Sequence, residues 1–156
     1  PAGARRWSGG RRLGRLGRFR RLGRVGCGAL DSAADGLRLI DCRITNAVKC
    51  LPPENKPLGA EINTCRDFLA AELAGFRDGG VVVALGAIAH KSVVAAFARP
   101  QRTCPFGHAA EHAMPRSITL IDSYHCSRYN TQTRRLTEAM FRDIVRRARE
   151  LLDAAA

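Results

Sequence analysis

A polar stretch in the C-terminal third of the chain holds the residue types most able to do chemistry. Residues 123–137 read SYHCSRYNTQTRRLT, with one histidine, two serines, one asparagine, three threonines and three arginines. A histidine can hold or release a proton near neutral pH, and hydroxyl, amide and guanidinium groups bind phosphate oxygens. The stretch has no regular apolar period, so we expect a loop. It is either a solvated connection or a binding and catalytic loop, and its place in the fold must decide.

Two cysteines form a second group with possible chemistry. Cys50 and Cys65 flank the proline-punctuated segment LPPENKPLG, with fourteen residues between them. Such a loop can return one thiol to the other, at a cluster or a metal ion, although two buried core thiols are the alternative interpretation. Iron–sulfur clusters and structural zinc take four ligands, so this pair is half of a set.

The apolar pattern predicts alternating strands and helices. Alternation indicates a strand over residues 37–45, and the continuous run VVVAL indicates a strand buried on both faces. SITLID indicates a third strand. Helical spacing of apolar residues follows each strand, over residues 60–76, 87–98 and 137–152. This order predicts an α/β fold with a short parallel sheet between helices.

The strand ends bring separate polar positions together. Ligands of open parallel sheets bind outside the carboxyl ends of the strands. Asn46, Gly86 and the loop that begins at Tyr124 each follow a predicted strand. We therefore expect these three positions to converge, which makes the polar loop a candidate site.

The net charge of +12 is concentrated at the N-terminus. Residues 1–30 contain nine arginines, eight glycines and no acidic residue, whereas the rest carries 17 Lys and Arg against 14 Asp and Glu. This composition predicts a tail that does not fold by itself. It can be a basic tail that grips phosphates, an organelle-targeting peptide, or a shifted reading frame in GC-rich DNA. Residues 31–156 are expected to form the α/β domain.

No secretory signal is visible, and the longest apolar run, residues 81–89, is too short to span a membrane. We therefore expect an intracellular, cytoplasmic protein with no membrane partner. Its cysteines are then thiols, metal ligands or core residues.

Four blocks carry a resemblance to a known family. They are ITNAVKCLPPENKPLGAEINTCRDFLAAEL, VVVALGAIAH, PFGHAAEH and SYHCSRYNTQTRRLTEAMF, in this order. Together they resemble the type 5, or class B, uracil-DNA glycosylases over residues 36–152. The resemblance implies a monomeric three-layer α/β/α sandwich, here without its N-terminal part. It also implies DNA containing uracil as the partner, hydrolysis of the N-glycosidic bond as the reaction, and a 4Fe–4S cluster as the cofactor.

The resemblance also implies roles for individual residues. His125 would stabilise charge that builds on the base as the bond breaks, and Cys50 and Cys65 would be two of four cluster ligands. The residues expected to bind the flipped nucleotide or its backbone are Asn46, Gly86, Ser127, Arg128, Asn130 and Arg134. His108 and His112 match family positions, but we assign them no physical role, and a structural use is the alternative.

The sequence departs from the family pattern in two places. No C-x-x-C pair and no glycine-rich motif that ends in an acidic residue precede residue 37, and Cys126 stands where the family has proline. A non-catalytic DNA-binding remnant and an unstable truncation product therefore remain alternatives to an active glycosylase.

Overall fold

The computed structural model describes residues 39, 41–50 and 57–155, to which every structural statement below refers. The chain divides into two units, Pro1–Arg43 and Ile44–Ala156. All the helices and strands described lie in the second unit. The predicted tail, residues 1–30, lies outside the described residues, as does most of the proline loop.

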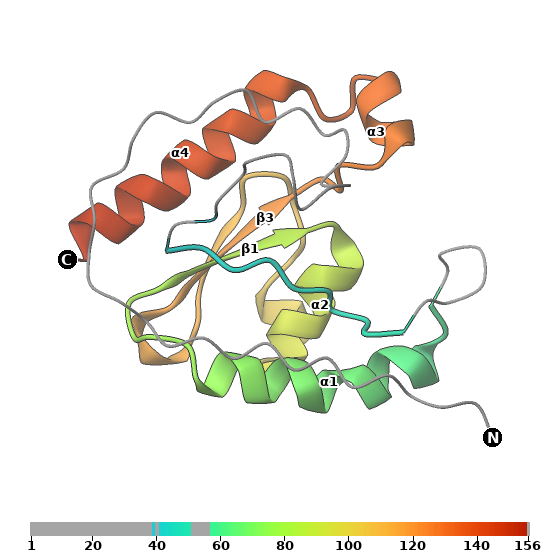
Figure 1. Cartoon of the computed structure of the whole chain (residues 1–156), viewed down its shortest axis with the longest axis vertical. Helices are drawn as coiled ribbons and strands as arrows, with labels where there is room; N and C mark the ends of the chain where they lie inside the picture. The colour runs from blue at the N-terminus through green and yellow to red at the C-terminus, as the bar shows by residue number, and fades with distance from the viewer. Residues whose placement is uncertain (1–38, 40, 51–56, 156) are drawn as a thin grey trace. The chain divides into compact units, whose positions relative to one another are not determined.

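The described sheet has three short strands in the order β1-β3-β2 (Figure 1). Strand β1 (Val81–Leu85) pairs in parallel with β3 (Thr119–Ser123), with Val83 opposite Ile121. Strand β2 (Glu111–Ala113) pairs antiparallel with β3. The predicted parallel pair is therefore present, but the sheet is mixed because β2 returns to β3 through a tight turn.

Helices cover the two faces of the sheet. Helix α2 (Ala87–Ala96) contacts β1, and α1 (Gly59–Ala74) packs on α2. Helix α4 (Glu138–Ala154) contacts β1 and β3 from the other face (Figure 1). This arrangement is the predicted three-layer α/β sandwich. Two 3-10 turns, Gln101–Thr103 and Pro115–Ser117, and the short helix α3 (Arg128–Gln132) lie in the connections.

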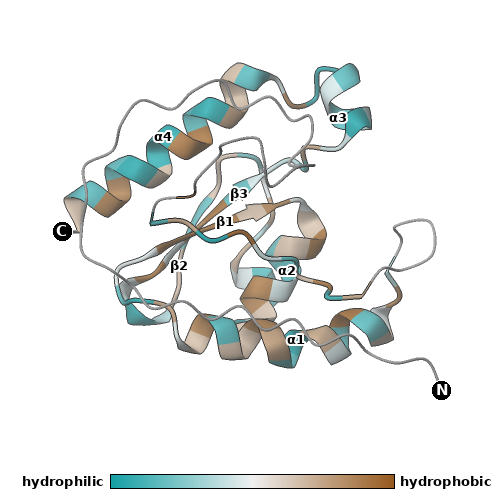
Figure 2. Ribbon diagram, viewed as in Figure 1, coloured by the Kyte–Doolittle hydropathy of each residue, from teal (hydrophilic) through white to brown (hydrophobic). Residues whose placement is uncertain are grey.

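The core follows from the alternation of side chains along β3. Leu120 belongs to the cluster shared with Leu69 and Leu73 of α1 and Val94 of α2, whereas Ile121 lines the groove beneath α4 with Ile144. Successive strand residues point to opposite faces, so β3 is buried on both. Figure 2 shows the matching pattern on α4, where hydrophobic and hydrophilic residues alternate around the helix.

One arginine closes the C-terminal end of α1. Nη1 of Arg116 donates to the carbonyl oxygens of Leu73, at 3.2 Å, and Ala74, at 3.1 Å, and Nη2 donates to that of Phe76. Its Nε lies 2.6 Å from Oδ1 of Asp78. The last carbonyls of a helix have no partner within the helix, so a cation from the β2–β3 turn satisfies them.

The sequence predictions of elements were largely confirmed, with one error and two omissions. Helices over residues 60–76, 87–98 and 137–152 and strands over 81–85 and 117–122 correspond to α1, α2, α4, β1 and β3. The strand predicted over residues 37–45 is wrong at its described positions, 39 and 41–45, none of which is in a strand. Ile44 is 59% exposed there. Alternating apolar residues make a strand only where a neighbouring strand supplies hydrogen bonds. The sequence reading missed β2 and α3.

We predict that Arg116→Met destabilises the chain by about 1–2 kcal/mol, because the helix carbonyls lose a charged donor. Chemical denaturation at neutral pH measures this. The matched control is Arg142→Met on α4, whose only described ion pair joins side chains that are 64% and 65% exposed. The control should stay within about 0.5 kcal/mol of the parent. Equal stability of the two variants would contradict a stabilising role for the Arg116 hydrogen bonds.

Candidate active site

The carboxyl ends of the two parallel strands meet at Gly86 and His125. Gly86 follows β1, and its N–H donates to the carbonyl oxygen of Ser123, the last residue of β3, at 2.8 Å. Gly86 has φ 93, and a Cβ built on it would lie 3.0 Å from Cβ of His125. A side chain at this position would be strained and would press on the histidine. The structure thus brings together two of the three positions expected to converge.

The backbone of His125 is held by the helix that follows it. Nδ2 of Asn130 donates to the carbonyl oxygen of His125 at 2.8 Å. Ser127 caps α3, with its Oγ accepting the N–H of Asn130 at 3.4 Å. Ser and Asn form local hydrogen bonds of this kind in loops and at helix ends. Both polar side chains therefore shape the loop, while the imidazole of His125 is exposed.

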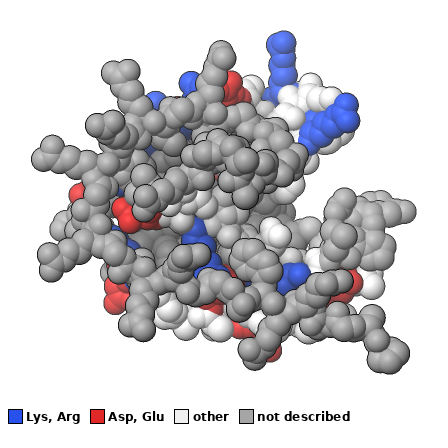
Figure 3. Space-filling model, viewed as in Figure 1, with Lys and Arg blue, Asp and Glu red and all other residues white. Residues whose placement is uncertain are grey.

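Basic side chains surround α3. Figure 3 shows Lys and Arg side chains projecting from the surface at the corner where α3 lies in Figure 1. Arg128 and Arg134 are exposed. Neither guanidinium has an ion-pair partner within the part of the chain that the structure describes. Tyr129 between them is 69% exposed. Cations and an aromatic ring free at one surface suit contact with a nucleic-acid backbone.

Asn46 stands apart from this group. The next residue, Ala47, packs against the hydrophobic core, so Asn46 is attached to the folded unit. Its exposed side chain forms no hydrogen bond with Gly86, with the His125 loop or with any other described residue.

The two predicted cluster cysteines are neighbours. The N–H of Lys49 donates to Sγ of the buried Cys65 at 3.2 Å. The pKa of the exposed Cys50 thiol is raised, first by reduced hydration and then by Glu61 and by Cys65, whose thiol is hydrogen-bonded to it. Backbone N–H groups directed at sulfur are typical of iron–sulfur sites. No third Cys, His, Asp or Glu side chain joins them within the described ranges, so these residues do not make a four-ligand set.

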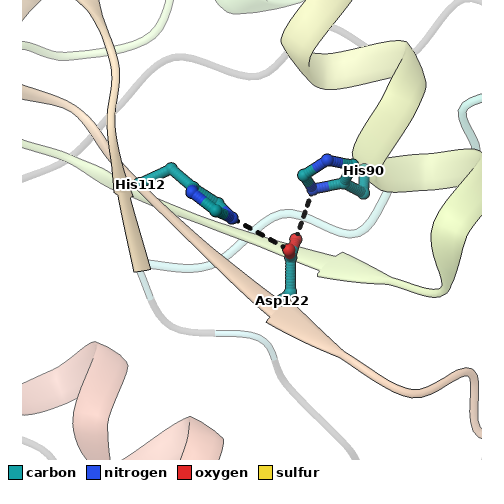
Figure 4. Close-up of side chains that lie close together, drawn as sticks. All are labelled: His90, His112 and Asp122. Carbon is teal, nitrogen blue, oxygen red and sulfur yellow. Dashed lines mark hydrogen bonds and ion pairs between the residues drawn. The ribbon is translucent and has the colours of Figure 1, made fainter. Parts of the chain in front are cut away.

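A buried group that the sequence reading missed lies beside the strand ends. His90 of α2 and His112 of β2 both contact Asp122 of β3 (Figure 4). His90 Nδ1 lies 2.8 Å from Asp122 Oδ1, and His112 Nε2 lies 3.2 Å from Asp122 Oδ2. His90 and Asp122 are 1% and 0% exposed. The aspartate that ends SITLID was the available signal, but without β2 nothing placed His112 next to it.

The hydrogen bonds of His90 extend beyond Asp122. His90 Nε2 lies 2.8 Å from the carbonyl oxygen of Cys104, so both of its ring nitrogens face oxygen atoms. A carbonyl oxygen only accepts, so Nε2 donates to it, and Nδ1 shares a hydrogen bond with the Asp122 carboxyl group. The three ligand atoms lie within 4.8 Å of one another, a grouping that can also take a divalent ion. The spacings to Asp122 are nevertheless those of hydrogen bonds, and each oxygen of the carboxyl group lies against one imidazole nitrogen.

Comparison with known proteins identifies the relatives of this chain. The family model described as the uracil DNA glycosylase superfamily matches residues 10–149, beginning inside the Arg- and Gly-rich segment. The chain is 41% identical over 117 residues to the type-5 uracil-DNA glycosylase of Thermus thermophilus, which covers 75% of this chain and 53% of the relative. It is 38% identical over 133 residues to the type-5 uracil-DNA glycosylase of Mycobacterium tuberculosis, covering 84% of this chain and 50% of that protein.

A type-5 uracil-DNA glycosylase of Pyrobaculum aerophilum is 34% identical over 117 residues, covering 75% of this chain and 50% of the relative. The chain thus spans about half the length of the curated relatives it matches. Among the described residues, no helix is both long and apolar enough to cross a membrane.

We predict that Asp122→Asn lowers the free energy of unfolding by about 1–3 kcal/mol, because an amide does not reproduce both hydrogen bonds of the buried carboxyl group to His90 and His112. Urea denaturation at pH 7 tests this. Asp143→Asn on α4 is the matched control, since the Asp143 side chain is 59% exposed and pairs with Arg146 at the surface. Equal stability of the two variants would contradict a stabilising role for the Asp122 hydrogen bonds.

Proposed function

Because the chain belongs to the uracil-DNA glycosylase superfamily, we propose that it supplies one side of a site that removes uracil from DNA by hydrolysing the N-glycosidic bond. The observation that carries the proposal is the contact between Gly86 and His125 at the carboxyl ends of β1 and β3. An exposed imidazole beside the carboxyl ends of parallel strands, the edge at which ligands of such sheets bind, supports the proposal. The type-5 relatives supply the substrate class by their names.

In this proposal the imidazole of His125 acts on the departing base. Enzymes that act on a base rotate its nucleotide out of the stack and into a pocket. As the glycosidic bond breaks, negative charge gathers on the base, and an N–H of His125 donates to the base O2. The sugar gains oxocarbenium character and is captured by water, by analogy with O-glycoside hydrolysis. Asn46, with an amide donor and acceptor side by side, hydrogen-bonds the edge of uracil.

The remaining loop residues bind or position the DNA. Ser127 keeps its hydroxyl proton for a phosphate, because its oxygen is the acceptor in the α3 cap. Arg128 and Arg134 contact neighbouring phosphates. Asn130 was expected to touch the substrate, but its bond to the His125 carbonyl supports a positioning role.

Cys50 and Cys65 are the two residues that we propose as ligands of an iron–sulfur cluster. Two of four ligands are available among the described residues, so no step of the reaction is assigned to a 4Fe–4S group. We predict that the chain purified without oxygen contains far less than four iron and four sulfide per molecule, because two thiolates do not complete the coordination. Iron and sulfide assays measure this. Four irons per chain, lost in Cys50→Ser, would contradict it.

The second candidate is a DNA-binding protein without catalysis. The observation that favours it is the pair of exposed arginines around α3, with the Arg-rich residues 1–30 as a further source of charge. Phosphate contacts alone give binding that weakens steeply with salt.

The test is uracil release from a single-stranded oligonucleotide. We predict that His125→Ala lowers the rate by at least about 10²-fold, as for the loss of a donor to developing charge. Arg142→Ala on α4 should leave it unchanged. The same assay uses the chain extended by the N-terminal region of the Thermus thermophilus relative. Release by neither form, with salt-sensitive DNA binding, would refute the glycosylase and leave the second candidate.

A further inference from the structure

His108 holds the backbone immediately before His125. Its Nδ1 accepts the N–H of Tyr124 at 3.2 Å. Its ring stacks on that of Tyr124, with centroids 4.9 Å apart and planes at 20°. No role was predicted for His108 from the sequence, and the glycosylase chemistry proposed above does not use it.

The contact continues the β2–β3 ladder beyond its last strand residue. His112 pairs with Leu120. The N–H of Asp122 then donates to the carbonyl oxygen of Ala110 at 2.9 Å. The N–H of Ala109 donates to the backbone carbonyl oxygen of Asp122 at 2.8 Å. The next backbone amide that faces this side is that of Tyr124, directly after β3. Its acceptor is Nδ1 of His108, which takes the place of a backbone carbonyl oxygen. Gly86 bonds Ser123 from the opposite side, so the chain is held on both sides where it leaves the sheet.

We propose that His108 is a positioning residue for His125, and that its neutral imidazole fixes the Tyr124 amide while protonation releases it. The inference rests on the proposed function for the role of His125. An imidazole nitrogen accepts a hydrogen bond only through a free lone pair, so His108 carries its proton on Nε2. The imidazolium has no acceptor and must abandon the Tyr124 N–H.

The surroundings of His108 favour the neutral form. Partial burial lowers the pKa of His108. Cζ of Arg135 lies 4.8 Å from the centroid of the Tyr124 ring, so a cation is already present at this aromatic group. Other charged side chains line the groove that His108 shares with β2 and α4: Glu111, Asp143, Arg146, Arg147 and Glu150.

These groove charges largely pair with each other. Arg147 hydrogen-bonds Glu111 and holds the pKa of that carboxyl below its usual value. Arg146 pairs with Asp143. The buried group of His90, His112 and Asp122 lies on the adjoining strand residues and forms hydrogen bonds within itself. The acidic side chains near His108 thus have other partners, and none of them forms a hydrogen bond or ion pair with His108.

The direction of the pH effect follows from the lowered pKa. The Tyr124 hydrogen bond is fully present above the ordinary pKa of histidine, and it is lost as the pH falls through the lowered pKa of folded His108. The rate of uracil release should therefore fall at acidic pH, in part because His108 becomes protonated.

Two substitutions of His108 distinguish the effect of its hydrogen-bond acceptor from that of its stacked ring. In His108→Asn the side-chain oxygen can replace Nδ1 but cannot titrate in this range. We expect release at pH 7.5 within about threefold of the parent, without the acid-side loss due to His108. His108→Phe keeps the stack and removes the acceptor. We expect a loss of about tenfold at every pH, as for one hydrogen bond. Glu150→Gln, which changes charge in the same groove, should keep the parent pH profile.

A readout without catalysis separates this inference from the proposed function. NMR of the full chain should show the Tyr124 amide shift following the titration of the His108 ring, and no such titration in His108→Asn. This result in a chain that releases no uracil, either alone or with the N-terminal extension, would support the positioning contact and refute the glycosylase function. Release with His108→Phe at the parent rate and pH profile, or a Tyr124 amide indifferent to His108, would overturn the inference. Should His108→Phe fail to fold, His108→Asn and the amide titration still decide it.

Discussion

Strand β3 is the one strand of the described sheet with a hydrogen-bonded neighbour on each side, and the candidate site depends on how its two ladders end. On one side the last bond joins Ser123 to Gly86. On the other the last bond joins Tyr124 to the side chain of His108. His125 is the next residue, so its place is set by two bonds that arrive from different elements. An exposed histidine gains a defined position in this way without being buried itself.

The buried polar group of His90, His112 and Asp122 joins three elements at one carboxyl group. Asp122 is fully buried, and an unpaired carboxylate there would be strongly destabilising. His90 and His112 come from α2 and β2, so satisfying Asp122 requires both elements to dock against β3. The network therefore makes the position of β3 dependent on the neighbouring helix and strand. Packing of Leu120 and Ile121 alone would hold the strand but would select its register less sharply.

The sequence predicted those features that depend on local pattern. VVVAL and SITLID are buried runs, and the helices have clear apolar spacing, so β1, β3 and the flanking helices were accessible. The convergence of Gly86 with His125 followed from parallel topology alone. Strand β2 has only three residues, EHA, with an exposed residue at each end, too short for periodicity to register. Without β2, the partners of Asp122 and of Tyr124 could not be deduced. The strand predicted over residues 37–45 failed at its described positions for the converse reason, since its alternation carries no information about a pairing partner.

Cys126 shows how the same loop can be held by different means. Proline at this position would restrict φ directly after the histidine and stiffen the loop from within. Cysteine imposes no such restriction, and Cys126 is only half-buried. The restraint in this chain comes from outside the residue. Asn130 holds the His125 carbonyl, Gly86 packs against the His125 Cβ, and His108 holds the preceding amide. Two of these restraints are hydrogen bonds through side chains, each worth about 1 kcal/mol. The order of the histidine therefore depends on several weak contacts that one substitution can remove, and one of them can be switched by a proton.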